Sequence, residues 1–137
     1  MMGTSSTNGT TTKGMVKYFE KIGWQVKSSA KDKTPDNYED FLKFVTANLK
    51  DNTPIIVENV DWGGHWRVII GYDTMGTEIT QDDVIIVADP YDTTDHNQDG
   101  YGVYPAERLM YNFTMYDAFP ESEGGNDMLF IVASPAE

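Results

Sequence analysis

The stretch GHWRVIIGYD at residues 64–73, followed by VIIVADPYD at residues 84–92, decides the fold of this chain. Each stretch contains a run of β-branched and apolar residues that is short for a helix and typical of a buried strand. The polar residues 74–82 separate the two runs, which predicts a pair of antiparallel strands. A similar run, PIIVENV at residues 54–60, comes before them, so the three together predict an antiparallel meander.

The residues before these strands have helical periodicity. Residues 12–22 and residues 38–49 each place apolar side chains three and four positions apart, which predicts two amphipathic helices. Asp36 or Asn37 is expected to cap the second helix, because both side chains can accept a hydrogen bond from the first turn. Alternation at residues 24–28 predicts a short strand between the two helices.

The last third of the chain is expected to contain more loop. Residues 89–103 and 120–127 are polar and rich in turn-forming residues, which favours loops. Residues 105–113 predict a short helix with a proline in its first turn. The apolar residues 128–133 predict a last buried strand.

The chain of 137 residues is expected to form a single α+β domain over residues 1–137, with a helical part at 1–50 and an antiparallel sheet part at 51–137. The charge divides at the same point. The first part has eight lysines and five acidic residues, whereas the second has two arginines and seventeen acidic residues. The net charge of −12 argues against nucleic acid or an anionic membrane as a partner. No apolar run approaches the roughly 20 residues of a membrane span. The acidic part either keeps the protein soluble or faces a basic peptide or a cation.

Two residues at the ends of the predicted strands are candidates for chemistry. His65 begins one strand directly after Gly63 and Gly64, which leave room for a substrate chain, and Asp89 ends the next strand. In an antiparallel pair the first residue of one strand lies beside the last residue of the other, so we expect His65 and Asp89 to meet. A carboxylate beside an imidazole holds its tautomer and stabilises the imidazolium, as in a catalytic triad. The alternatives are a structural histidine and an aspartate that ends a turn before Pro90.

These stretches resemble the second half of papain-like cysteine peptidases, and most of all the group that processes bacteriocin precursors with a double-glycine leader. That group has a Gly-His strand, a Gly-Tyr-Asp turn and an Ala-Asp-Pro strand end, which correspond to residues 64–65, 71–73 and 88–90. Residues 9–26 resemble the segment that follows the nucleophile helix of the family. The resemblance covers roughly residues 3–92. It implies a papain-like fold in which N-terminal helices pack on an antiparallel β-sheet.

The resemblance implies that His65 is the general base that pairs with a thiolate, and that Asp89 orients His65. The cysteine of the family begins a helix, and the glutamine of its oxyanion hole lies just before that cysteine. Both would fall upstream of Met1, and the chain has no cysteine. We therefore expect a domain truncated at its N-terminus that does not cleave peptides alone. The intact protein would hydrolyse peptide bonds through an acyl-enzyme, with the nucleophile helix supplied by an upstream segment or by another chain.

A non-catalytic interpretation remains open, in which the domain keeps a papain-like fold and binds a peptide or protein without chemistry. Trp62, Gly63 and Gly64 are the candidates to line the substrate groove, because on a strand Trp66 points away from His65. Loss of a first helix would expose an apolar patch, so a homodimer is also expected.

A second candidate site is DHNQDGY at residues 95–101. It matches the first half of a calcium loop, with side-chain oxygens from Asp95, Asn97 and Asp99, then a glycine and the carbonyl of Tyr101. The twelfth position lacks the acidic residue that such a loop requires. These residues therefore predict either a bound Ca²⁺, in a module stabilised by calcium, or a solvated turn. The peptidase chemistry itself requires no cofactor.

Overall fold

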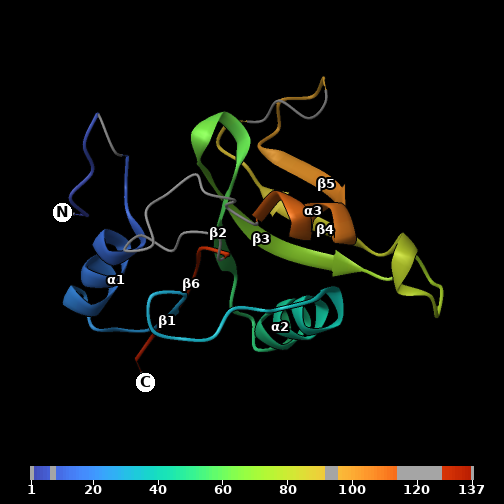
Figure 1. Ribbon diagram of the computed structural model, residues 1–137, viewed down its shortest axis with the longest axis horizontal. Helices are drawn as coiled ribbons and strands as arrows, with labels where there is room; N and C mark the ends of the chain where they lie inside the picture. The colour runs from blue at the N-terminus through green and yellow to red at the C-terminus, as the bar shows by residue number, and fades with distance from the viewer. Residues whose placement is uncertain (1, 7–8, 92–95, 114–127, 137) are drawn as a thin grey trace.

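A computed structural model describes residues 2–6, 9–91, 96–113 and 128–136 of the chain (Figure 1). The elements of this part are α1 (Thr12–Lys21), β1 (Trp24–Ser28), α2 (Tyr38–Lys50), β2 (Ile55–Asn59), the 3₁₀ helix η1 (Asp61–Gly63), β3 (His65–Asp73), the 3₁₀ helix η2 (Thr80–Asp82), β4 (Val84–Ala88), β5 (Tyr101–Pro105), α3 (Ala106–Phe113) and β6 (Phe130–Pro135). The helices and strands predicted at residues 12–22, 24–28, 38–49, 54–60, 105–113 and 128–133 are confirmed, with boundaries that shift by one or two residues. The strands predicted within the stretches 64–73 and 84–92 are β3 and β4.

The six strands of the described part form one antiparallel sheet in the order β1-β6-β2-β3-β4-β5. The strands β2 to β5 follow one another as a meander, which confirms the predicted arrangement and extends it by one strand. The last strand, β6, returns to the other side of β2 and pairs there with both β1 and β2 (Figure 1). Because β1 belongs to the same sheet, the helical part at residues 1–50 is joined to the sheet part by direct strand pairing.

The prediction of a loop at residues 89–103 is wrong for its last residues, because Tyr101–Pro105 forms β5 and pairs with β4. Gly102 is buried, whereas Tyr101 and Val103 are exposed, as expected for alternate residues of an edge strand. The glycine and the terminal proline weaken the strand signal of this segment, which explains the error. The loop predicted at residues 120–127 lies outside the described residues.

The helices α2 and α3 cover one face of the sheet, and α1 lies against β1 and β6 (Figure 1). The face under α2 and α3 holds the main core, with Phe41, Leu42, Val45, Leu109 and Phe113 from the helices and Ile55, Val57, Ile69, Ile85, Val87, Phe130 and Val132 from the strands. Ile131 alternates with its two neighbours in β6 and is also buried, on the side that α1 contacts. The sheet is therefore packed on both faces near β6, whereas Tyr101 and Val103 remain exposed at the β5 edge. The expected homodimer stays a prediction.

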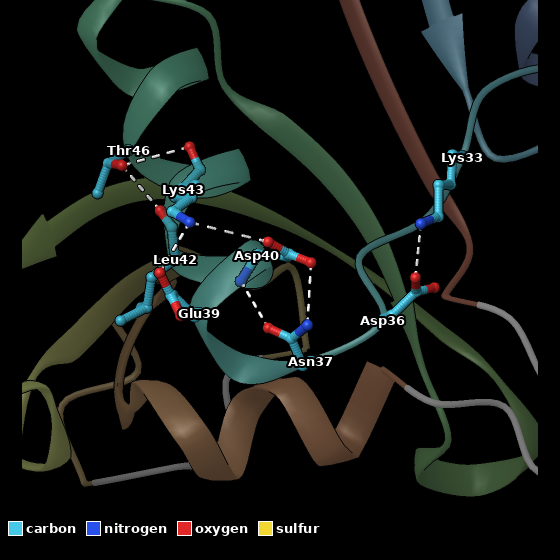
Figure 2. Close-up of polar contacts among 8 residues, drawn as sticks. All are labelled: Lys33, Asp36, Asn37, Glu39, Asp40, Leu42, Lys43 and Thr46. Atoms are coloured by element: carbon cyan, nitrogen blue, oxygen red, sulfur yellow. Dashed lines mark hydrogen bonds and ion pairs between the residues drawn. The ribbon is translucent and has the colours of Figure 1, made fainter.

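The start of α2 shows which of the two candidate residues caps the helix (Figure 2). Asn37 accepts a hydrogen bond from the backbone amide of Asp40 at 2.9 Å, and its side-chain amide donates to the Asp40 carboxylate at 2.9 Å. Asp36 instead forms an exposed ion pair with Lys33 at 2.6 Å. The N-cap is therefore Asn37.

Replacing Asn37 with alanine is expected to lower the free energy of unfolding by about 1 kcal/mol, because an amide of the first turn loses its acceptor. Urea denaturation measures the change. The neighbouring Asp36→Ala variant is the control, and it is expected to change the free energy by less than about 0.5 kcal/mol because exposed ion pairs contribute little. Equal losses in the two variants would contradict the assignment of the cap.

Candidate active site

The side chains of His65 and Asp89 are in contact at one end of β3 and β4. His65 is the first residue of β3, and Asp89 directly follows the last residue of β4. Nε2 of His65 lies 2.6 Å from Oδ1 of Asp89. The Asp89 side chain is 1% exposed and the His65 side chain is 17% exposed. The predicted meeting of these two residues is confirmed, whereas their role in catalysis stays a prediction.

The register of β3 and β4 explains how the two side chains reach each other. Val68 pairs with Ala88, so Asp89 extends toward Arg67, and His65 lies two residues further along β3. A bulge between Ile69 and Gly71 sets this register. His65 and Arg67 lie on the same face of β3, because alternate residues of a strand share a face. Both side chains can therefore approach the same carboxylate.

The carboxylate of Asp89 is held on both oxygens. The backbone amide of Tyr91 donates a hydrogen bond to Oδ1 at 2.9 Å, beside the contact with His65. Nε of Arg67 lies 2.6 Å from Oδ2, in an ion pair rather than an aligned hydrogen bond. The backbone amide of Asp89 donates to the carbonyl of Gly100 at 2.8 Å, which attaches this residue to the start of β5. These contacts fix the orientation of the carboxylate.

The surroundings of Asp89 keep it ionised. Burial alone would raise its pKa, since a charged carboxylate is disfavoured away from water. The hydrogen bonds from His65 and from the Tyr91 amide, together with the charge of Arg67, outweigh burial and hold the pKa of Asp89 below its ordinary value of 3.8. An ionised carboxylate can only accept hydrogen bonds, so Nε2 of His65 carries the proton in this contact. In the neutral ring the lone pair is then on Nδ1.

Arg67 is a residue of this site that the sequence analysis missed. It is 2% exposed, and its guanidinium contacts a second carboxylate, with Nη2 3.2 Å from Oδ2 of Asp61. The same guanidinium lies 5.1 Å from the centre of the Tyr104 ring, which is within the range of a cation–π contact. The available signal was an arginine in a strand of valine and isoleucine, two residues after His65, because a buried arginine requires anions.

The 3₁₀ helix η1 and Gly64 after it connect β2 to β3, and this connection contains the residues predicted to line the substrate groove. Gly63 and Gly64 have φ angles of 81° and 128°, a region that favours glycine. The side-chain amide of Asn59 donates to Oδ2 of Asp61 at 2.9 Å, the same oxygen that Arg67 contacts. The connection is thereby attached to the His65 site. The side chain of Trp62 lies outside the described part of the structure.

The ring of Tyr91 lies close to His65, whereas the side chain of the next residue, Trp66, is bound elsewhere. The ring of Tyr91 meets the imidazole edge to face, with 6.0 Å between the ring centres, and Tyr91 is 66% exposed. Sequence analysis missed it because it follows the turn at Pro90. The indole of Trp66 donates to the carbonyl of Thr10 at 3.0 Å, so β3 is attached to the segment that leads into α1. Tyr91 is therefore the exposed aromatic neighbour of the imidazole.

The predicted calcium loop falls only partly within the described residues. Asp95 lies outside them. Oδ1 of Asp99 accepts a hydrogen bond from the amide of Tyr101 at 3.0 Å, a local bond that also occurs in turns without a metal. In the described part, which omits residues 92–95, no three acidic or histidine side chains come together in a way that could hold a metal ion. Calcium binding by Asn97 and its neighbours stays a prediction.

Comparison with known proteins identifies the family of the chain. The sequence pattern of the Peptidase_C39 like family matches residues 2–116, a range that includes His65, Asp89 and all elements from α1 to α3. No curated protein and no solved structure matches the chain. Among the described residues no helix is long and apolar enough to cross a membrane. The match and the helix-covered antiparallel sheet confirm the predicted α+β class and papain-like fold. The chain belongs to the Peptidase_C39 like family.

Proposed function

We propose that this domain carries the base and the orienting residue of a cysteine peptidase site, with His65 as the general base and Asp89 as the residue that orients it. The observation that supports the proposal is the buried contact of 2.6 Å between Nε2 and Oδ1, in a chain of a peptidase-like family. Since Nε2 is bound to Asp89, Nδ1 is the atom that would accept the proton of a thiol. The order of the Gly-His, Gly-Tyr-Asp and Ala-Asp-Pro motifs favours the group that processes bacteriocin precursors.

The chemistry follows from these two side chains and a thiol. Nδ1 of His65 takes the thiol proton, and the thiolate attacks the carbonyl carbon of the peptide bond. The imidazolium then returns the proton to the leaving amine, and water hydrolyses the acyl-enzyme. The ionised carboxylate of Asp89 stabilises the imidazolium while it exists. Because none of the 137 residues is a cysteine, we propose that the thiol comes from outside them, on an upstream segment or on another chain.

The surface beside His65 is proposed to bind the substrate chain. Gly63 and Gly64 lie directly before His65 in the chain, and beyond the chain neighbours of Gly63 no atom lies within 4 Å of the place where its Cβ would be, which leaves room for an approaching peptide. Trp62 belongs to the same connection and is retained as a candidate from the sequence. Tyr91 adds an exposed ring next to the imidazole.

Residues 1–137 alone are expected to cleave no peptide, because the thiol nucleophile is missing. The measurement is hydrolysis of a mixture of fluorogenic peptides, with and without iodoacetamide, against a buffer blank. His65→Ala is the active-site control and His96→Ala is the matched control at the only other histidine. Cleavage that His65→Ala abolishes and His96→Ala retains would contradict the proposal that the thiol is supplied from outside.

A second candidate function is peptide binding without cleavage. It is favoured by the lack of cysteine together with the exposed Tyr91 ring beside the imidazole. Binding of the same peptides to residues 1–137 tests it, and Tyr91→Ala is expected to weaken binding if the groove holds a chain. Peptidase activity that appears once a thiol is supplied would favour the first function.

A further inference from the structure

We propose that Arg67 is a positioning residue of the His65 site. Its guanidinium holds Oδ2 of Asp89, so that Oδ1 of the same carboxylate remains against His65. The inference rests on the proposed function of His65 and Asp89, and it adds the residue that keeps their geometry.

The first argument is that two residues of β3 contact the two oxygens of the Asp89 carboxylate. His65 and Arg67, two residues apart on the same face of β3, contact Oδ1 and Oδ2 of Asp89 at 2.6 Å each. A carboxylate that is held on one oxygen can still turn about its Cβ–Cγ bond, because that torsion has broad minima. A second contact on the other oxygen prevents the turn. The lone pair of Oδ1 then stays directed at Nε2.

The second argument is that Arg67 is itself fixed from three sides. Besides Asp89, it contacts Asp61 through Nη2 at 3.2 Å and lies over the ring of Tyr104 at 5.1 Å. These neighbours come from different elements: Asp61 begins η1, Asp89 follows β4, and Tyr104 is in β5. The planar guanidinium of an arginine can contact two carboxylates and the face of a ring at the same time, whereas the ammonium of a lysine is a single point charge. Arg67 therefore links η1, which precedes Gly64 and His65, to the carboxylate of Asp89.

The third argument is the charge balance of the cluster. Asp61 and Asp89 are two carboxylates, and the guanidinium of Arg67 contacts both. The three together carry one negative charge, which an imidazolium at His65 would neutralise. Arg67 thus offsets one of the two carboxylate charges of the cluster.

A purely structural role for Arg67 predicts a different result from a positioning role. A structural arginine would affect the stability of the fold but leave the proton of the His65 ring where it is. A positioning arginine would also determine which ring nitrogen carries the proton. The chain has only two histidines, His65 and the exposed His96, so the ring ¹⁵N signals of both can be assigned and His96 serves as an internal reference.

The experiment compares the imidazole ¹⁵N spectrum of four forms of residues 1–137 with neutral rings. Wild type is expected to have the His65 proton on Nε2. Arg67→Met, which keeps an apolar stem, is expected to give a mixture of both tautomers at His65. Arg67→Lys, which keeps the cation, is expected to give a smaller admixture of the second tautomer. Arg108→Met removes an exposed arginine of the same acidic half and is expected to match wild type.

Unchanged His65 signals in a folded Arg67→Met or Arg67→Lys variant would overturn the proposal. Failure of both variants to fold, with Arg108→Met folded, would show a structural role and would also overturn it. The readout needs no peptide cleavage. If wild type itself does not hold the proton on Nε2, the proposed function of His65 and Asp89 fails. If wild type holds it and the Arg67 variants do too, only the role of Arg67 fails.

Discussion

Replacing Phe113 with alanine is expected to lower the free energy of unfolding by about 3–5 kcal/mol, because it removes a buried ring and leaves a cavity. Phe113 is the last residue of α3 and is 1% exposed. Its ring lies against Phe41 of α2, with 5.9 Å between the ring centres. Since domains of this size are stable by only about 5–15 kcal/mol, the expected loss is a large part of the total.

The control for this prediction lies on the same helix. Tyr111 is 59% exposed, and Tyr111→Ala is expected to change the free energy of unfolding by less than about 0.5 kcal/mol. Denaturant titration of both variants gives the two values. Phe41→Ala combined with Phe113→Ala is expected to cost less than the sum of the single changes, because each removes the same ring contact. Similar small losses for Phe113→Ala and Tyr111→Ala would show that α3 is not anchored as described.

The end of α3, where Phe113 lies, is also connected to the candidate active site. The carbonyl of Asn112 accepts a hydrogen bond from the backbone amide of Val60 at 2.9 Å, directly before η1. The end of α3 is therefore attached to the connection that carries Gly63 and Gly64. Loosening α3 is expected to loosen this connection, so changes at Phe113 affect the proposed groove without touching it.

The local elements of the fold could be predicted because their signals are local. The apolar period of residues 12–22 and 38–49 requires one buried face, and the structure has helices there. The runs at β2, β3 and β4 are β-branched and closely spaced, which favours neighbouring antiparallel strands.

The position of β6 could not be predicted in the same way. Its apolar residues indicated a buried strand, but its pairing with β1 and β2 joins segments that are far apart in sequence. Such pairing depends on whether the apolar residues of all three strands lie on the same buried face of the sheet, which a local sequence pattern does not show. The strand β5 was missed for the opposite reason, because an edge strand needs few apolar residues and tolerates the glycine and proline of Tyr101–Pro105.

The part of the candidate site that depends on strand pairing was predicted from the sequence. The part that depends on the packing of side chains was missed. The meeting of His65 with Asp89 was expected from antiparallel pairing, although the observed register places Asp89 toward Arg67 and His65 two residues further along β3. The contacts of Arg67 depend on the register that the bulge between Ile69 and Gly71 sets. A glycine inside a strand, such as Gly71, often marks a bulge, but it does not give the resulting register. Tyr91 could not be placed, since its ring position depends on the turn at Pro90.

Replacing His65 with alanine is expected to abolish peptidase activity in any form of the protein in which a cysteine reaches this site. Such a form is a longer protein that includes residues 1–137, or a complex with a chain that supplies the thiol. In the proposed mechanism His65 takes the thiol proton and later protonates the leaving amine, so the alanine would remove both functions. The loss of both steps is expected to lower kcat/KM by about 10⁴-fold or more.

The matched control for His65→Ala is His96→Ala, because the chain has no third histidine. His96 is exposed, so its replacement is expected to leave kcat/KM within about twofold of wild type, as is usual for surface positions away from a site. Circular dichroism and the denaturation midpoint are measured for both variants to test whether they are folded. Equal activity of His65→Ala and wild type would mean that another base serves the thiol. A loss in both variants would point to a general effect on the fold, whereas a loss in His65→Ala alone would identify the imidazole as the base.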